Sequence, residues 1–405
     1  MDEVKRKNFI LINSLAGGGA ERQVSLISNL TEIDKIILLE PIINYAIPTE
    51  KLIVLSTSKN SIFRKIFLLF YAPFYLRKIG LDKHTNLFCF LQLSYIIGFF
   101  CKIVCKCQFI ICIRTSPIGF YKQYKGLKIP YFIYSYLLKH SNKVICNSAT
   151  SALQLIEILK VPQAISIPNG YDVSKIQTLS QTKDPIWEKI IENKDVLITV
   201  GRLVHDKAQW HLIRVFAQLK SQYPSLALVL LGEGPLLEDL IELCKLLNLK
   251  SYSYHSNQEL NDQYDVYFLG FQKNPNYYVA KSKLFLLPSL YEGLPNVVLE
   301  SLLVNTPCVL SDCLTGPREI LLPNSNLFDQ TETEIYTPFG ALLPTFNGKM
   351  ILDDSALNET EKIWEKAILY FLSNPELLEN MKLNCNTIKQ KYSQELIFDL
   401  WKAQF

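Results

Sequence analysis

Short runs of consecutive apolar residues alternate along this chain with longer stretches that have helical spacing. The apolar runs lie at residues 9–12, 36–39, 87–91, 109–113, 143–147, 196–200, 226–231, 266–270 and 283–287. Runs that are this short and apolar throughout are typical of strands buried in a parallel sheet, and the helical stretches are typical of the crossover connections. The pattern predicts an α/β protein built on doubly wound parallel sheets.

The length of 405 residues exceeds the usual size of one hydrophobic core. We therefore expect two domains of about 200 residues each. Hydrophobic residues make up 49% of the chain and charged residues 20%, with no low-complexity tract. The composition predicts a chain that is globular throughout.

Charge is distributed unevenly between the two halves. Residues 1–180 contain 22 basic and 10 acidic side chains, a net charge of +12, whereas residues 181–405 contain 20 and 28, a net charge of −8. Such a split points to a partner and not to a fold. The basic half is expected to meet an anionic surface.

Ten cysteines occur, and three of them, Cys101, Cys105 and Cys107, lie close together in an apolar context. A metal site is conceivable at this spacing, but no histidine or further cysteine lies nearby in the sequence. We expect buried, reduced thiols and a cytosolic compartment.

Residues 288–300, PSLYEGLPNVVLE, place two carboxylates eight positions apart across a Gly-Leu-Pro turn. Pro295 suits the first turn of a helix over 296–303, and the free N–H groups of that helix end form an anion site suited to a phosphate. Glu292 lies in the loop before the helix, and Glu300 lies about one turn into it. Both acids face one ligand, unlike the pair of a glycosidase, although two glutamates alone are also compatible with a solvated surface.

Three glycines, Gly17, Gly18 and Gly19, separate the first strand from a helical stretch at 20–30. Such a loop lets the backbone approach a ligand closely and leaves a helix N-terminus open, which suits a diphosphate. A dinucleotide fold is an alternative interpretation, because Glu40 ends the next strand where a ribose-binding acid is expected. Arg22, however, stands where that motif needs a small residue.

The second half restarts with a strand that runs into residues 201–207, GRLVHDK. Gly201 lets the chain turn away from the strand end, and Arg202 and Lys207 are two cations that can converge on a diphosphate. A solvated cationic loop is the alternative.

The amino-acid sequences of these segments resemble those of one enzyme family. EGLPNVVLES is similar to the E-x7-E signature of the retaining nucleotide-sugar glycosyltransferases of family 4, and the similarity continues through LGFQKN, NTPCVLSDCLTGPREIL, GRLVHDK and AGGGAERQVSLISNL. The resemblance implies the GT-B fold, in which two Rossmann-like domains face each other across a deep donor and acceptor cleft. It also implies an N-terminal domain over 1–178, a C-terminal domain over 179–387, and a final helix, about 388–405, that packs back on the first domain.

The resemblance assigns roles to individual residues. Glu292 would touch the donor sugar near the reacting carbon, Arg202 and Lys207 would neutralise the leaving nucleotide, and these three are the catalytic candidates. Glu300 would hold the ribose, and the turn at Gly270 and Phe271 would read the base. The donor-binding candidates are Gly17, Gly18, Gly19, Gly270, Phe271, Gly293, Leu294, Pro295, Asn296, Val297 and Glu300.

Acceptor binding is expected in the basic N-terminal domain, at Arg114, Lys122 and Lys125. Arg114 follows a strand at a carboxyl end, where such folds place ligands. Many relatives in the family carry a histidine nearby, and this chain has Arg114-Thr115-Ser116-Pro117 instead, so no histidine-dependent role is carried over.

Residues 59–79 combine an eleven-residue apolar stretch with lysine and arginine at both flanks. The stretch is too short to span a bilayer and contains Pro73. It is compatible with a partly buried helix or with a helix that lies in the interface of an anionic membrane. Residues 120–136 repeat the mixture of aromatic and basic side chains.

The function favoured by the sequence is a retaining glycosyltransferase. It would move a hexose or N-acetylhexosamine from a nucleotide-diphospho-sugar, a UDP-sugar, to a lipid-linked glycan acceptor in bacterial polysaccharide, lipopolysaccharide or glycoprotein-glycan synthesis. We expect no metal and no cofactor, because no Asp-x-Asp motif follows a strand. We also expect no nucleic-acid partner, and a cytoplasmic location at the inner face of the membrane. The alternatives are a GT-B-fold UDP-sugar epimerase, a non-catalytic membrane-surface binding protein and a dehydrogenase.

Overall fold

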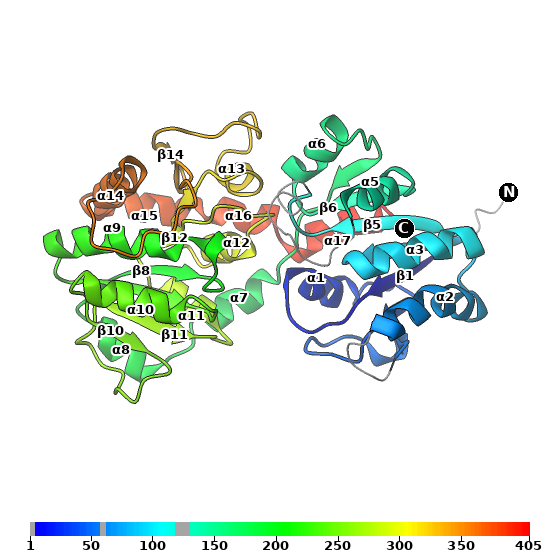
Figure 1. Cartoon of the computed structure of the whole chain (residues 1–405), viewed down its shortest axis with the longest axis horizontal. Coiled ribbons are helices and arrows are strands. Elements are labelled where there is room, and N and C mark those ends of the chain that lie inside the picture. The colour runs from blue at the N-terminus through cyan, green and yellow to red at the C-terminus, as the bar shows by residue number, and fades with distance from the viewer. Residues whose placement is uncertain (1–4, 57–61, 118–129) are drawn as a thin grey trace. The chain divides into compact units, whose positions relative to one another are not determined.

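The computed structural model describes residues 5–56, 62–117 and 130–405. They form two compact units, Met1–Gly170 with Gln394–Phe405, and Tyr171–Ser393 (Figure 1). The first crossing between the units therefore falls at 170, where the sequence suggested 178, and the chain returns at 394, where it suggested 388. We call the two parts unit 1 and unit 2.

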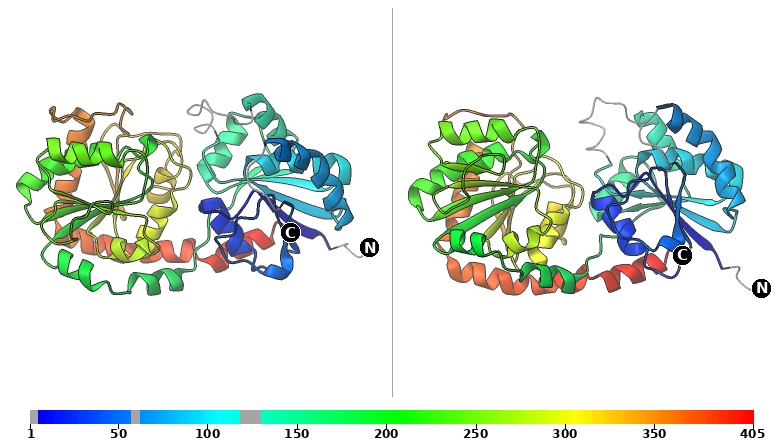
Figure 2. Two further views of the ribbon diagram at one scale, coloured as in Figure 1. Left: turned by 60° about the horizontal axis from the view of Figure 1, so that its bottom comes forward. Right: turned by 90° about the horizontal axis from the view of Figure 1, so that it is seen from below.

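Unit 1 contains a seven-stranded, wholly parallel sheet with the order β3-β2-β1-β4-β5-β6-β7. Its helices cover both faces (Figure 2). One face packs on α1 and α17, and the other on α2, α3, α5 and α6. The strands are β1 (Lys7–Ile12), β2 (Lys35–Leu38), β3 (Leu52–Val54), β4 (Thr85–Phe90), β5 (Gln108–Ile113), β6 (Lys143–Cys146) and β7 (Ala164–Ser166). The helices are α1 (Gly19–Ile27), η1 (Thr49–Lys51), α2 (Ile62–Lys78), α3 (Gln92–Cys105), α5 (Tyr131–Lys139), α6 (Ala149–Glu157) and α17 (Gln394–Lys402).

Unit 2 contains an eight-stranded sheet with the order β10-β11-β9-β8-β12-β13-β15-β14, in which the β14–β15 pair is antiparallel. Two hydrophobic clusters fill its two faces. The strands are β8 (Asp195–Val200), β9 (Leu226–Leu231), β10 (Ser251–Ser253), β11 (Val266–Gly270), β12 (Leu284–Leu287), β13 (Cys308–Ser311), β14 (Ile335–Thr337) and β15 (Gly340–Leu343). The helices are α7 (Val173–Ser180), α8 (Pro185–Ile191), η2 (His205–Lys207), α9 (Gln209–Gln222), α10 (Leu237–Leu246), α11 (Pro275–Ala280), α12 (Asn296–Leu303), α13 (Pro317–Leu321), α14 (Glu359–Leu372), α15 (Pro375–Asn384) and α16 (Asn386–Lys391).

Every apolar run identified in the sequence coincides with a strand, so the prediction of parallel α/β sheets is confirmed. The runs did not indicate β13 and β15, which are buried inside the sheet but have only four residues each. They also did not indicate β3, β7, β10 and β14. Each of these four has three residues and is partly exposed, because it lies at the edge of its sheet. An edge strand needs no continuous apolar run and gives no such signal.

The C-terminal helix α17 belongs to unit 1. Its Trp401 ring lies 5.9 Å from the ring of Phe88, and Ile397 is buried beside Gly170. Gln23 of α1 donates to the carbonyl of Gly170 at 3.1 Å and accepts from its N–H at 3.0 Å. These contacts fix the last residue of unit 1 before the chain crosses into unit 2.

All ten cysteines are buried and free, as predicted. Burial raises the pKa of Cys107 and of Cys112 to about 12. Within the described ranges, no three or more His, Cys, Asp or Glu side chains are grouped as metal ligands would be. No helix in the described part of the chain is long and apolar enough to cross a bilayer.

The packing of α3 on the sheet generates a stability prediction at Gly98. A Cβ there would lie 2.4 Å from the sulfur of Cys89 and 2.7 Å from the ring of Phe109. Gly98→Ala should therefore lower the melting temperature by about 3 to 10 °C. An unhindered Gly→Ala change in a helix would raise it.

Thermal unfolding followed by circular dichroism tests this prediction. Ile103→Ala, at an exposed position of the same helix, serves as the control and should change the melting temperature little. A stabilised Gly98→Ala protein would contradict the close contact between α3 and the sheet.

Candidate active site

The candidate residues of unit 2 gather at the carboxyl ends of neighbouring strands. The chain leaves β8 toward β9 on one side, and β12 later pairs with the other side of β8. This is a topological switch point, where parallel sheets open a crevice for ligands. The loop after β8 carries Arg202 and Lys207, and the loop after β12 carries Glu292.

The loop after β8 is held by close backbone packing. A Cβ on Gly232 would lie 2.1 Å from the carbonyl oxygen of Gly201, and Gly232 has φ +135°. Leu290 donates its N–H to the carbonyl of Asp206 at 2.9 Å, which ties the loop after β12 to η2. The side chain of Arg202 is exposed, and no ion pair among the described residues involves it.

Glu292 is held in place by two side-chain partners. Its Oε1 forms an ion pair with Nζ of Lys207 and accepts a hydrogen bond from Ser289 Oγ at 2.7 Å. The side chain of Glu292 is only 10% exposed and that of Lys207 24%. Burial, with the charge of Glu292 as the next cause, raises the pKa of the neighbouring Cys313. The pair therefore lies in a largely desolvated place where each charge needs the other.

The turn that leads into α12 is held in place by contacts with residues just before α13. Thr315 Oγ1 donates to the backbone carbonyl of Glu292. Gly316, at φ +91°, lies so close that a Cβ would be 2.1 Å from the carbonyl oxygen of Gly293. The tight packing holds residues 292–296 against the loop before α13.

Helix α12 begins at Asn296, as the sequence predicts, with Pro295 as its N-cap residue. No side chain caps this end by a hydrogen bond from the N-cap position. Tyr171 donates its hydroxyl to Asn296 Oδ1 at 2.7 Å. Glu300 lies one turn into the helix and is buried. The helix end can thus offer backbone N–H groups and its dipole to an anion.

The turn after β11 lies beside the loop after β9. Gly270 has φ +66° and accepts from the N–H of Gly232 at 2.8 Å. Phe271 is exposed, and its N–H donates to Glu233 at 3.4 Å. The structure therefore brings the predicted donor residues of the loops after β8, β11 and β12 to one edge of the sheet in unit 2.

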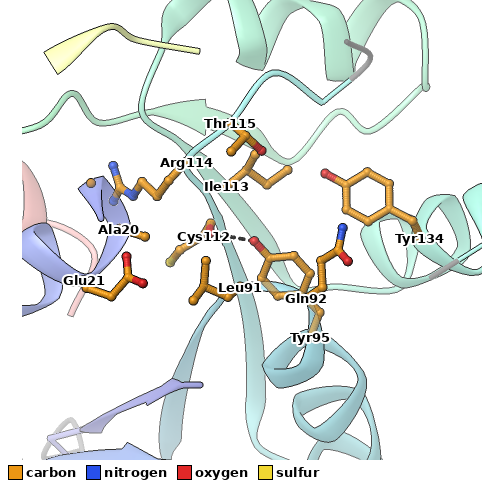
Figure 3. A pocket seen from close by; sticks show the side chains of 11 residues that line it. Ala20, Glu21, Leu91, Gln92, Tyr95, Cys112, Ile113, Arg114, Thr115 and Tyr134 are labelled. Atoms are coloured by element: carbon orange, nitrogen blue, oxygen red, sulfur yellow. Dashed lines mark hydrogen bonds between the residues drawn. The ribbon is translucent and has the colours of Figure 1, made fainter. Parts of the chain in front are cut away.

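Unit 1 has its own pocket at the corresponding switch point, between β1 and β4. The cavity measures about 230 Å³ and is lined by residues that follow β1, β4 and β5 (Figure 3). Figure 3 places the side chains of Glu21 and Arg114 on one side and those of Gln92 and Tyr134 on the other. Gly17, Gly18 and Gly19 precede α1 here, and Gly19 lines the cavity.

Arg114 is largely enclosed by aromatic rings. Its guanidinium lies 5.5 Å from the ring of Phe90 and 5.4 Å from that of Trp401, and it donates to the carbonyl of Ile167 at 3.2 Å. Nε and Nη2 are buried without a hydrogen-bond partner among the described residues. Burial lowers the pKa of Arg114. The other two acceptor candidates, Lys122 and Lys125, lie outside the described residues.

Glu21 was not among the residues selected from the sequence. Its carboxylate folds back over the start of α1, 2.6 Å from the place a Cβ on Gly18 would take, and hydrogen-bonds its own N–H. Burial is the larger effect and raises the pKa of Glu21. Ser289, Thr315 and Gly316 were also missed. Apart from the Thr-Gly spacing before Pro317, nothing in the sequence distinguishes them from other loop residues.

Comparison with known proteins agrees with this geometry. Residues 181–335 match the family described as "Glycosyl transferases group 1". An uncharacterized glycosyltransferase of Methanocaldococcus jannaschii is 33% identical over 74% of this chain and 72% of its own length. The N-acetylgalactosamine-N,N'-diacetylbacillosaminyl-diphospho-undecaprenol 4-alpha-N-acetylgalactosaminyltransferase of Campylobacter jejuni is 30% identical over 88% of this chain and 93% of its own length.

Among solved structures, HepE of Anabaena in complex with UDP superposes with a TM-score of 0.72 at 16% identity, over 98% of this chain and 99% of that one. The sucrose-phosphate synthase of Thermosynechococcus elongatus gives the same TM-score at 17% identity, over 98% of each chain. These likenesses establish the fold. The chain belongs to the family of glycosyl transferases group 1, has the GT-B fold and is a glycosyltransferase.

Proposed function

We propose that the protein is a retaining glycosyltransferase that moves a hexose or N-acetylhexosamine from a UDP-sugar to a glycan acceptor carried on a lipid. The observation that carries the proposal is the convergence of Lys207 and Glu292 beside the N-terminus of α12. A cation, a carboxylate and an open helix end suit a sugar joined to a diphosphate.

In the proposed reaction the departing diphosphate is the main site of developing negative charge. Arg202, Lys207 and the N–H groups of Gly293, Leu294, Asn296 and Val297 would surround it. Pro295 has no N–H and instead fixes the backbone at the helix start. Preorganised charges of this kind lower the barrier because they need no reorganisation during the reaction.

Glu292 would position the donor sugar and stabilise positive charge on its ring. Ser289 and Lys207 hold the carboxylate in one orientation. The leaving phosphate would take the proton of the acceptor hydroxyl, so that the new bond forms on the face that the phosphate leaves. Glu300 would bind the ribose, and the turn at Gly270 and Phe271 would hold the base.

The acceptor would bind to unit 1. The pocket of about 230 Å³ has Glu21 and Arg114 on one side and is smaller than the pockets of drug-sized ligands, so it suits a part of a glycan. Gly17, Gly18 and Gly19, which lie at the start of α1, would bind a phosphate. Lys122 and Lys125 remain acceptor candidates from the sequence.

A lipid-linked acceptor has two supports. The Campylobacter jejuni relative is named for a diphospho-undecaprenol substrate. The +12 net charge of residues 1–180 suits both an acceptor diphosphate and an anionic membrane surface. The protein would work at the inner face of the cytoplasmic membrane. Incubation with UDP-hexoses and UDP-N-acetylhexosamines, with and without a lipid extract, tests the whole proposal, because UDP should be released and lipid should increase the rate. No release of UDP from any of these donors would refute it.

Glu292→Gln should lower turnover about 100-fold or more and change UDP affinity little, because the carboxylate acts on the sugar and not on the nucleotide. Steady-state kinetics and calorimetry with UDP measure the two effects. Glu238→Gln, at an exposed position of α10, is the control and should behave like the wild type. Near-normal turnover of Glu292→Gln would remove this residue from the mechanism.

Arg202→Ala should weaken UDP binding about tenfold and leave uridine binding unchanged, because uridine lacks the diphosphate. This variant is preferable to Lys207→Ala, which would leave Glu292 without its partner. Glu300→Ala is the matched comparison and should weaken UDP and uridine alike. Equal losses for both ligands in Arg202→Ala would place this cation away from the diphosphate.

We further propose that catalysis needs no metal ion, since Arg202, Lys207 and α12 supply the positive charge. Treatment with EDTA should leave the rate of UDP release nearly unchanged. Loss of activity with EDTA that manganese restores would overturn this part of the mechanism and leave the donor residues to be tested separately.

A further inference from the structure

Helix α2 has two apolar faces, and only one of them is covered. Leu68, Ala72 and Leu76 are buried against the sheet of unit 1. The opposite face consists of side chains that are large, apolar and exposed. Phe67 is 59% exposed, Phe70 66% and Phe74 64%, and Ile66 and Tyr71 lie beside them.

The exposed face continues onto the neighbouring helices. The ring of Phe70 lies 6.5 Å from that of Phe100 on α3, and Phe99 lies 5.7 Å from Tyr136 on α5. All three helices cover the same side of the sheet, and Figure 2 shows them side by side. We define the aromatic face as Ile66, Phe67, Phe70, Tyr71, Phe74, Ile103, Tyr131, Phe132 and Tyr136, each of which is at least 40% exposed. A contiguous face of this kind marks a docking surface on a folded domain.

Acidic side chains are almost absent from this part of the chain. Between residues 51 and 156 the sequence contains 15 lysines and arginines and a single acid, Asp82. That acid is paired with Lys7. Helices α2, α3 and α5 contain no acid at all, and four exposed cations lie in their last turns or directly after them: Arg77, Lys78, Lys106 and Lys139.

We infer that the aromatic face docks on an anionic lipid surface, with the phenylalanines of α2 below the headgroups and the four cations at the level of the phosphates. Aromatic and aliphatic side chains flanked by lysine and arginine are the pattern of an interfacial helix. A second copy of this chain is a poorer occupant, because two such faces would bring like charges together. The inference rests on the proposed lipid-linked acceptor and identifies the surface that reaches the membrane.

The insertion can be measured directly with a reporter tryptophan. All four native tryptophans are buried, so they are shielded from lipid. The emission maximum of Phe70→Trp should shift to shorter wavelength, and its intensity should rise, when vesicles of equal parts phosphatidylglycerol and phosphatidylcholine are added. Brominated phosphatidylcholine in the vesicles should quench this emission. Ile186→Trp, at an exposed position of unit 2, should show neither effect. Absence of quenching at position 70 in bound protein would overturn the assignment of this face.

Flotation with the same vesicles measures how strongly the protein binds to the lipid surface. The wild type should float at about 0.1 M salt and much less at about 0.5 M, where screening is stronger, and it should not float with pure phosphatidylcholine. The triple change Phe67→Ser, Phe70→Ser, Phe74→Ser should lower partitioning at least about tenfold. The matched control is Ile186→Ser with Leu383→Ser, two exposed apolar positions of unit 2, which should float like the wild type.

Charge is tested separately from the aromatic side chains. Arg77→Gln, Lys78→Gln and Lys106→Gln together should weaken flotation, whereas Lys175→Gln, Lys183→Gln and Lys349→Gln, which remove three exposed cations of unit 2, should not. Unchanged melting temperature and UDP affinity show that each variant is folded. Wild type that stays unbound at low salt, or equal binding to neutral vesicles, would overturn the inference.

The same variants separate this inference from the proposed function. If the enzyme releases UDP in the presence of lipid extract but does not float, the lipid surface is wrong and the donor site stands. If the enzyme floats but releases no UDP, the lipid surface stands and the proposed donor site is wrong. Ultracentrifugation of the wild type and the triple phenylalanine variant reveals self-association. A dimer that only the wild type forms would assign the face to a second copy and overturn the lipid surface.

Discussion

The constraint on which the structure depends is that both sheets are covered on both faces. The inner residues of parallel strands such as β8 and β12 are buried, and nearly all of them are apolar. Polar chemistry is therefore confined to the loops at strand ends. The reversal of strand order beside β8 separates the helices that follow adjacent strands, and this separation leaves the loops after β8 and β12 accessible to a ligand.

Within that opening, the ion pair of Lys207 and Glu292 determines how the loops are arranged. Each side chain is mostly buried, and a buried charge without its partner is strongly destabilising. The pair therefore fixes η2 against the turn before α12, and Ser289 adds a neutral donor to the same oxygen. Arg202 is exposed and is free to move toward a ligand. The two cations of this loop therefore differ, because one is held by an ion pair and the other is exposed to solvent.

The apolar runs were sufficient for nine strands, and Pro295 for the start of α12 at Asn296. The return of the C-terminal helix to unit 1 came from the family resemblance alone. The sequence was not sufficient for edge strands such as β3, since exposure removes their pattern. Contacts made through the backbone were also hidden. Gly316 packs on the carbonyl of Gly293 from 23 positions along the chain, and only the fold brings the two together.

The two helix ends that look alike in the sequence differ in the structure. Both α1 and α12 follow a strand through a turn that contains glycine, and both are expected to bind an anion. The end of α1 already carries the carboxylate of Glu21, folded back over Gly18. The end of α12 has no side-chain cap from its N-cap residue, Pro295. An anion that binds at the end of α1 would have to displace this carboxylate, whereas at α12 no side chain of the N-cap residue has to move.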